Sequence, residues 1–217
     1  MAAVLPLEND RSYPNMDCMS PRRSATAAAG TRTAIVQRAL EVGSVEGLEG
    51  LTIGRLADDV GMSKSGLIRH FGSKEGLQMA ALEAAIEIFR REIWEPAADA
   101  EPGIARLRAI CDAWIAYQEG NLLPGGCFMT AAASEFDGRG GPVATATRDA
   151  WARWSRLLER DARTAIEAGQ LPSGTDPGQI AFEMNGIGLA LNQALQLHRD
   201  RSAISRARVA FERVLAP

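Results

Sequence analysis

Apolar residues recur at intervals of three and four positions along most of the chain beyond residue 30. In the first such stretch, Ile35, Val36, Ala39, Leu40 and Val42 fall on one face of a helix, which is the spacing of an amphipathic helix packed on one side. No segment shows the strict alternation of apolar and polar residues that marks a half-buried strand. The pattern therefore predicts an all-α chain.

Three short helices are predicted within residues 31–71. Gly47 and Gly50 end the first of them. Thr52 and Ser63 precede the next two, where their hydroxyl oxygens can accept from a free amide of the first helical turn and so form N-caps. Gly61 falls in the turn between those two helices, where a positive φ costs glycine little. Two short helices joined by a glycine-containing turn are typical of a helix-turn-helix.

A longer series of helices follows, giving about nine in all. Ser73 can cap the first helix of this series, and Asp176 followed by Pro177 suits the start of a late one. Breaks are predicted at NLLPGG and GRGG. The predicted helices cover about residues 74–95, 102–119, 127–136, 142–168, 176–198 and 202–215.

The first 30 residues lack this periodicity. They contain three prolines and the low-complexity stretch SATAAAG, so residues 1–30 are predicted to be a disordered tail. Arg22 and Arg23 in this tail are either solvated charges or an arm that touches DNA.

The net charge of −3 at pH 7 argues at first against a nucleic-acid partner, because DNA-binding domains are usually basic. The charge is unevenly spread, however. From Arg22 to Glu75 there are eight cations against six anions, a net charge of +2, whereas residues 76–217 carry 15 against 18, a net charge of −3. Both lysines, Lys64 and Lys74, lie in the cationic part. The N-terminal helices are therefore the part suited to a polyanion.

Several classes of protein are excluded by what the sequence lacks. No apolar run approaches the roughly eighteen residues of a membrane span, and no secretory signal is recognised at the N-terminus. Cys18, Cys111 and Cys127 have no paired spacing, which excludes a disulfide framework or a zinc knuckle. His70 and His198 form no metal-binding motif, and phosphate-binding glycine loops are absent. We expect a cytoplasmic protein that is not an enzyme and has no cofactor, metal or membrane partner.

The segment TIGRLADDVGMSKSGLIRHFGSKEGL (52–77) resembles the DNA-binding domain of TetR-type transcriptional regulators. The resemblance covers about residues 31–80 by motif and the rest of the chain by helix pattern, with a weaker similarity between Gly125 and Phe136 to one subgroup of the family's regulatory domains. Its motifs are Thr52, Leu56-Ala57, Gly61, Ser63-Lys64-Ser65-Gly66, His70-Phe71 and Ser73-Lys74-Glu75-x-Leu77.

The sequence departs from the family pattern at three places. Ile68 stands where the family usually has a tyrosine that reaches a phosphate, and Gly43 stands where an aromatic residue is usual. Asp58 and Asp59 put two like charges on the second helix, which weakens its approach to phosphates if both point at DNA.

The chemistry of the helix ends indicates which residues contact DNA. A recognition helix enters the major groove by its N-terminal residues, where free amides and the positive end of the helix dipole favour phosphate. Lys64 and Arg69 can donate to guanine or to phosphate, and His70 and Lys74 to the backbone. The predicted DNA-binding residues are Thr52, Ser63, Lys64, Ser65, Gly66, Arg69, His70 and Lys74.

Large apolar side chains gather on the helices after residue 96. Most residues of this kind belong to the core, but three of the four tryptophans lie in one 41-residue window, which suggests an apolar cavity with a few polar anchors. The predicted ligand-binding residues are Trp114, Tyr117, Gln118, Phe128, Met129, Phe136, Trp151, Trp154, Met184 and Asn185, with Tyr117, Gln118 and Asn185 as the polar anchors.

The last two predicted helices suit association with a second copy. Residues 180–197 are apolar almost all round the helix, so more than one face requires burial. TetR-type regulators pair through their last two helices, and the resemblance therefore implies a homodimer. The predicted interface residues are Ile187, Leu191, Leu195, Ile204, Ala207 and Phe211.

The resulting hypothesis is a homodimeric repressor that binds a near-palindromic operator and is released by a small apolar or aromatic ligand. The domains would be a helix-turn-helix DNA-binding domain (31–77) and a helical ligand-binding and dimerisation domain (78–217). One alternative is a thiol-sensing regulator through Cys127 or Cys111. Another, from a different class, is a helical ligand-binding protein or enzyme that keeps a relic DNA-binding domain.

Overall fold

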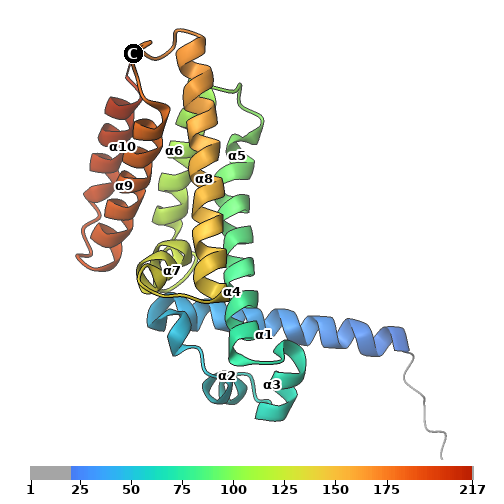
Figure 1. Ribbon diagram of the computed structural model, residues 1–217. Coiled ribbons are helices and arrows are strands. Elements are labelled where there is room, and N and C mark those ends of the chain that lie inside the picture. Colours follow the sequence, from blue (N-terminus) through green and yellow to red (C-terminus); the bar gives the residue numbers. More distant parts are fainter. Residues whose placement is uncertain (1–20, 217) are drawn as a thin grey trace, which may run out of the picture.

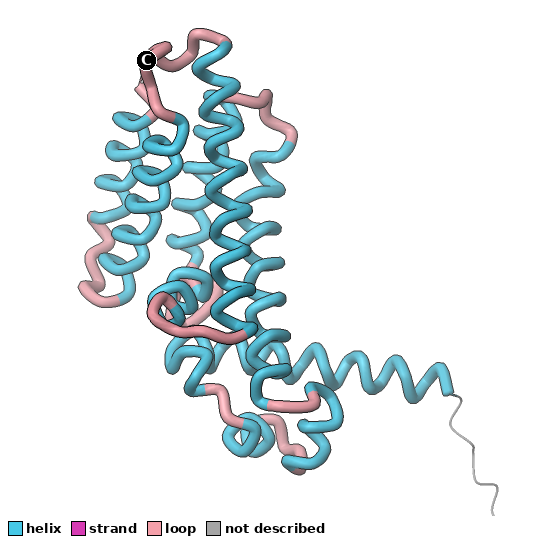
Figure 2. Tube along the Cα trace, in the orientation of Figure 1, coloured by secondary structure: helices cyan, strands magenta, loops and turns pink. Residues whose placement is uncertain are grey.

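The computed structural model describes residues 21–216, with side chains from residue 28 on, and within them it contains helices and loops but no strand (Figure 1, Figure 2). The predicted all-α fold is confirmed. The elements are α1 (Pro21–Gly50), α2 (Ile53–Asp59), α3 (Lys64–Phe71), α4 (Lys74–Phe89), the π-helical segment η1 (Arg90–Trp94), α5 (Glu95–Ala98), α6 (Ile104–Gly120), α7 (Phe128–Phe136), α8 (Pro142–Glu167), α9 (Pro177–Gln196) and α10 (Ala203–Val214).

The helices divide into a small unit at one end and a larger body. α1, α2 and α3 form the small unit, and α4 runs from it into the body, where it lies along α8 (Figure 1). α8 also packs against α9, which pairs with α10, while α6 contacts α8, α9 and α10. α7 lies where the two parts meet and packs against α1, α4 and α8. No helix of the described part is long and apolar enough to cross a membrane.

Helix α1 begins earlier than the sequence pattern predicts. Residues 21–30, predicted to be part of a disordered tail, belong to α1, while residues 1–20 and the side chains of Arg22 and Arg23 lie outside the described residues. Alanine has the highest helix propensity, so the SATAAAG stretch can extend a helix without an apolar face. At the other end of α1, Gly47 has a φ of +78° and interrupts the regular helix.

The predicted N-caps are confirmed. The side-chain oxygens of Thr52, Ser63 and Ser73 accept from the amides of Arg55, Gly66 and Gly76, at 3.2, 3.1 and 3.0 Å. Each cap satisfies an amide that has no partner within its helix. These local bonds fix where α2, α3 and α4 begin. Gly61 has the positive φ (+66°) expected in the turn between α2 and α3.

The fourth predicted helix is longer than expected and is not regular throughout. α4, η1 and α5 follow one another without a break from Lys74 to Ala98, and the chain continues through Pro96 in helical form. The amide of Glu95 donates to the carbonyl of Arg90, a bond of the π-helical type. This bond shifts the hydrogen-bond register just before Pro96, which has no N–H to donate. A single stiff rod therefore connects the small unit with the far end of the body.

We expect Gly76→Ala to destabilise the protein. A Cβ at position 76 would lie 2.0 Å from the carbonyl oxygen of Phe71, so the turn between α3 and α4 would have to open. Chemical denaturation should show a free energy of unfolding that is lower by about 1–3 kcal/mol, as at other overpacked sites. Gly30→Ala is the matched control, because a Cβ there meets nothing within 4 Å. Equal stability of Gly76→Ala and the wild type would contradict this account of the turn.

Candidate DNA-binding surface and ligand cavity

The N-terminal end of α3 is exposed and carries the predicted recognition residues. Ser63, Lys64, Ser65 and Arg69 are all exposed, and Gly66 is half-buried beneath the Ser63 cap. The stem of Lys64 lies across α2, because a Cβ on Gly54 would be 3.2 Å from its Cε atom. Within the described residues, neither Lys64 nor Arg69 has an ion-pair partner. Both cations are therefore free to meet a polyanion.

Other cations of the small unit are already engaged. Arg38 and Arg55 both bind Asp59, at 3.0 and 3.4 Å, and Arg55 also binds Glu46 at 3.2 Å. The guanidinium of Arg32 lies 4.7 Å from the centre of the Phe71 ring. The charge of Asp59 is thus balanced within the unit, which removes part of the repulsion expected from two adjacent aspartates.

Two predicted contact residues serve the fold itself. The ammonium of Lys74 donates to the carbonyl oxygen and to the carboxylate of Glu49, both at 2.9 Å, and so ties the start of α4 to the end of α1. This bond holds the pKa of the Glu49 carboxyl below its usual range. The hydroxyl of Thr52 accepts from Arg55 as a cap, although the residue is exposed. His70 is half-buried, with its ring tilted towards Phe71 at 6.2 Å.

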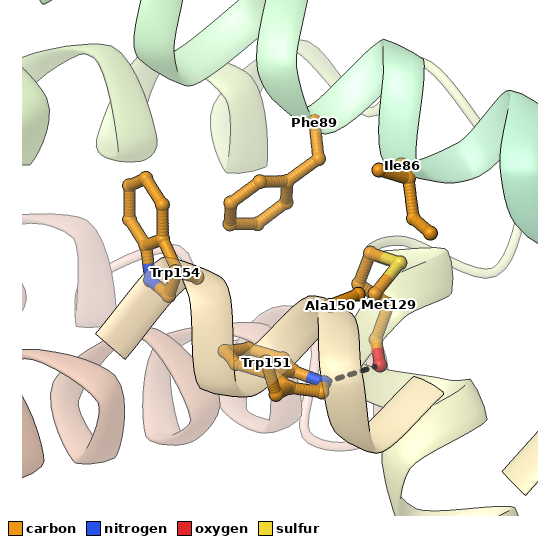
Figure 3. A pocket seen from close by; sticks show the side chains of 6 residues that line it. All are labelled: Ile86, Phe89, Met129, Ala150, Trp151 and Trp154. Atoms are coloured by element: carbon orange, nitrogen blue, oxygen red, sulfur yellow. Dashed lines mark hydrogen bonds between the residues drawn. The ribbon is translucent and has the colours of Figure 1, made fainter. Parts of the chain in front are cut away.

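An apolar cavity lies in the body between α4, α7 and α8 (Figure 3). The space open to the centres of water molecules is about 40 Å³, room for about three waters and far below the roughly 300 Å³ at which small-molecule pockets usually begin. The indole N–H of Trp151 donates to the carbonyl oxygen of Met129 at 3.3 Å across its edge (Figure 3). The lining residues are Ile86, Phe89, Met129, Ala150, Trp151 and Trp154.

Phe89 is the centre of an aromatic cluster beside the cavity. Its ring centroid lies 4.9 Å from that of Trp154, 5.8 Å from that of Trp114 and 6.2 Å from those of Tyr117 and Trp151, all edge to face. This geometry is the favourable one for aromatic pairs. The sequence prediction did not include Phe89, Ile86 or Ala150. Phe89 could have been predicted from one feature of the sequence: it is an aromatic residue at the end of α4, directly before η1.

The predicted ligand residues separate into those near the cavity and those elsewhere in the core. Met129, Trp151 and Trp154 line it, and Trp114 and Tyr117 join the cluster around Phe89. Asn185 bridges the indole of Trp154 and the hydroxyl of Ser155. The remaining predicted residues, Gln118, Phe128, Phe136 and Met184, are buried and do not line the cavity.

Phe128 explains the unusual glycine in α1. A Cβ on Gly43 would lie 2.8 Å from the Phe128 ring. The ring from α7 thus occupies the space next to position 43, where an aromatic side chain of α1 would otherwise lie.

Two buried polar atoms near the cluster lack a hydrogen-bond partner. They are Nε1 of Trp114 and Oε1 of Gln118, a donor and an acceptor one turn apart on α6. The side-chain amide of Gln118 donates to the carbonyl of Gly188 at 3.4 Å. The two helices approach closely here, because a Cβ on Gly188 would lie 2.3 Å from the Trp114 ring. Unsatisfied buried polar atoms are costly, so these two atoms lower the stability of the contact between α6 and α9.

The two cysteines of the described part are buried. Cys111 is 5% exposed and Cys127 is 1% exposed. Burial, together with nearby Asp112 and Glu212, raises the pKa of the Cys111 thiol well above its usual range. Cys18 lies outside the described residues. Within those residues, no cluster of three or more His, Cys, Asp or Glu side chains could hold a metal ion.

The predicted interface residues on α9 and α10 differ in their exposure. Leu191, Leu195, Ala207 and Phe211 are buried, but Leu191 and Ala207 also line the groove between α9 and α10. Ile187 and Ile204 are half-buried. The exposed apolar side chains are instead Phe182, Leu189, Leu197 and Val209. A shallow groove between α9 and α10 is lined by small residues, which include Ala190, Ala194 and Ala210.

Two protein-family models match the chain. The model of bacterial regulatory proteins of the tetR family matches residues 35–81, and the model of the tetracyclin repressor-like C-terminal domain matches residues 103–211, half of the chain. The first covers most of the small unit with its helix-turn-helix, and the second covers α6, α7, α8, α9 and most of α10. No curated protein matches the sequence.

Solved structures of the same fold include a TetR transcriptional regulator from Chloroflexus aurantiacus J-10-FL, with a TM-score of 0.74 and 25% identity over 88% of this chain and 94% of that chain. AibR, in complex with isovaleryl coenzyme A and operator DNA, has a TM-score of 0.73 and 20% identity over 86% of this chain and 99% of that one. A cysteine mutant of CifR, complexed with 26 bp operator DNA, has a TM-score of 0.67 and 25% identity over 84% and 94%.

The matched models and structures agree with the arrangement of a small helix-turn-helix unit joined by α4 to a helical body. The chain belongs to the TetR family of transcriptional regulators, with an N-terminal DNA-binding domain and a C-terminal ligand-binding domain.

Proposed function

We propose that this regulator is a dimeric repressor that binds a near-palindromic operator and leaves it when a small apolar or aromatic ligand enters the body. One observation carries the proposal: α4 runs without interruption from the recognition unit, where Ser73 caps it, to the cavity, where Ile86 and Phe89 line it. A change at the cavity therefore acts on the element that positions the recognition helix.

The exposed end of α3 supports binding in the major groove. Lys64 and Arg69 are exposed cations that can donate to guanine or phosphate oxygens. The free amides at the start of the helix add further phosphate contacts. Ile68 is 44% exposed and offers an apolar contact to a thymine methyl group in place of the hydroxyl that the family usually has.

The size of the cavity supports a small effector. A space of about 40 Å³ holds only about three waters, so even a compact apolar or aromatic effector must separate the edge-to-face rings around Phe89 to enter. AibR binds isovaleryl coenzyme A, but its 20% identity gives no reason to expect a coenzyme A ester in a space this small.

The packing around the cavity supports release of DNA on ligand binding. Rings pack edge to face around Phe89, so ligand entry has to move the end of α4 or the helices facing it. Movement of α4 changes the spacing of the two recognition helices in a dimer. Since half-sites lie about one DNA turn apart, roughly 34–36 Å, or somewhat more, a changed spacing lowers operator affinity.

The outer face of α9 and α10 supports the dimer. Phe182 is 72% exposed and Leu189 is 49% exposed, and the alanine-lined groove between the helices permits close approach of a partner helix. Exposed apolar faces of this kind mark association sites, and a two-fold dimer matches a near-palindromic operator.

The thiol-sensing alternative is less well supported. A redox-sensing cysteine is usually exposed and has a lowered pKa, whereas Cys111 and Cys127 are buried and the pKa of Cys111 is raised. The enzyme alternative has no catalytic constellation to support it within the described residues.

Lys64→Ala should weaken binding to the DNA upstream of the regulator's own gene by roughly tenfold to a hundredfold, the effect of losing a base or phosphate contact worth about 1–3 kcal/mol. Fluorescence anisotropy at several salt concentrations measures this, and the slope of log affinity against log salt should fall by about 2 for the two copies in a dimer. Arg160→Ala, which removes an exposed cation on α8, is the control. Undiminished affinity of a dimeric Lys64→Ala variant would remove Lys64 from the site.

Ala190→Arg should convert the dimer into a monomer, because it puts a long charged side chain into the groove between α9 and α10. Light scattering after gel filtration gives the molar mass. Ala105→Arg places the same side chain at an exposed position of α6 and should leave the dimer intact. A dimeric Ala190→Arg variant would place the interface on another face.

In a Cys18→Ser background, Cys111 and Cys127 should resist a disulfide reagent at pH 8 while the protein is folded. The raised pKa of the Cys111 thiol leaves less thiolate at this pH than in a free cysteine, whose pKa is about 8.5, and burial blocks access to both sulfur atoms. Absorbance of the released thiolate follows the reaction, and both thiols should react after denaturation. Rapid modification of the folded protein with loss of DNA binding would instead support thiol sensing.

A further inference from the structure

Glu135, in the last turn of α7, bonds to the backbone of the DNA-binding domain. Its Oε2 accepts from the amide of Leu48 and its Oε1 from the amide of Glu49, both at 2.7 Å. These two amides begin the short turn that follows the kink at Gly47. Successive amides that point at one carboxylate form an anion-binding nest, and bonds to an ionised acceptor are stronger than neutral ones. The contact joins residues 87 and 86 positions apart in the sequence.

Gly47 is shaped for this carboxylate in two ways. Its φ of +78° turns the next two amides towards α7, a conformation that favours glycine. A Cβ at this position would also lie 2.8 Å from Oε2 of Glu135. The glycine therefore creates the nest and leaves room for the group that fills it.

The same turn is held from the side of α4. Lys74 donates to the carbonyl of Glu49 and Gln78 donates to the carbonyl of Leu48, at 2.9 and 2.8 Å. Arg139, just beyond α7, reaches the carboxylate of Glu49 at 3.5 Å. Because Thr52 begins the capping of α2 three residues after Glu49, the orientation of the helix-turn-helix depends on how this turn is held.

Helix α7 also reaches the cavity. Its Met129 lines the cavity and accepts the indole N–H of Trp151, and its Phe128 packs on Gly43 of α1. One nine-residue helix thus contacts the ligand cavity near its start and caps the DNA-binding domain at its end.

We propose that Glu135 is a positioning residue for operator binding, and that α7 forms a second connection, beside α4, between the cavity and the recognition helix. The proposal rests on the proposed function. It predicts that loss of the carboxylate frees the turn at Leu48 and Glu49, so that the helix-turn-helix samples more orientations and binds its operator less well while the fold persists.

The test compares Glu135→Ala and Glu135→Gln with wild type in the full-length dimer. Glutamine keeps the size of the side chain, but its amide nitrogen would face a backbone N–H, so only one of the two bonds can form. Asp137→Ala is the matched control, because it removes an exposed carboxylate two residues away. Three measurements apply: exchange of the Leu48 and Glu49 amides, affinity for the upstream DNA, and the midpoint of thermal unfolding.

For Glu135→Ala we expect amide exchange at Leu48 and Glu49 to be roughly tenfold faster or more, and operator binding to be weaker by a similar factor, the size expected from losing bonds to a charged acceptor. Glu135→Gln should show smaller changes of the same sign. The thermal midpoints of both variants should stay within a few degrees of Asp137→Ala.

Equal exchange and equal DNA affinity in Glu135→Ala and Asp137→Ala would overturn the proposal, as would a fall in affinity that merely follows a fall in the thermal midpoint in both Glu135 variants. Faster exchange with unchanged affinity would also overturn it, because the turn would then be capped without positioning the domain. A wild-type protein that binds no upstream DNA would overturn the proposed function instead, and the positioning role with it.

Discussion

The stiffness of the helical rod from Lys74 to Ala98 is the constraint on which the rest of the regulator depends. An α-helix rises about 1.5 Å per residue, so α4 spans roughly 24 Å between its cap at Ser73 and the aromatic cluster at Phe89. The hydrogen bonds of α4 continue without a break where the small unit meets the body. The rod has to shift or rotate as a unit, and the π turn at residues 90–94 gives it a defined irregularity directly beside the cavity.

The cations of the DNA-binding domain fall into two groups, those that hold its helices in place and those that stay unpaired. Arg38 and Arg55 are bound to Asp59, and Lys74 is bound to Glu49, so these cations hold helices together. Lys64 and Arg69 have no ion-pair partner within the described residues and lie on the exposed side of α3. Such surface ion pairs contribute little to stability individually, but they leave the uncompensated positive charge on α3.

The parts of the fold set by local chemistry were predictable from the sequence. The caps at Thr52, Ser63 and Ser73 and the turn at Gly61 depend on neighbours within a few residues, and the structure has them as predicted. The DNA-contacting residues Lys64 and Arg69 remain predictions, now with exposed positions that suit them.

Partners distant in sequence were not predictable. The role of Glu135 could not be predicted, because nothing near it in the sequence shows that its carboxylate meets an amide 87 residues earlier. The bond from Lys74 to Glu49 was not predictable either, because Glu49 belongs to another helix. In α9, apolar residues surround the helix, so no polar face indicated that Leu191 and Leu195 point inward. Phe89 lies in the connecting helix rather than in the body, and its place in the cluster depends on how α4 is set against α8.

The aromatic cluster has a practical consequence. Of the four tryptophans in the chain, Trp114, Trp151 and Trp154 surround Phe89 within a few ångströms of the cavity. Trp151 is half-buried and holds its indole N–H on the carbonyl of Met129. A molecule that enters must alter the separation of these indoles and the polarity around them. The ultraviolet emission of the unlabelled protein is therefore a built-in optical signal of occupancy, with which a library of candidate effectors can be screened directly.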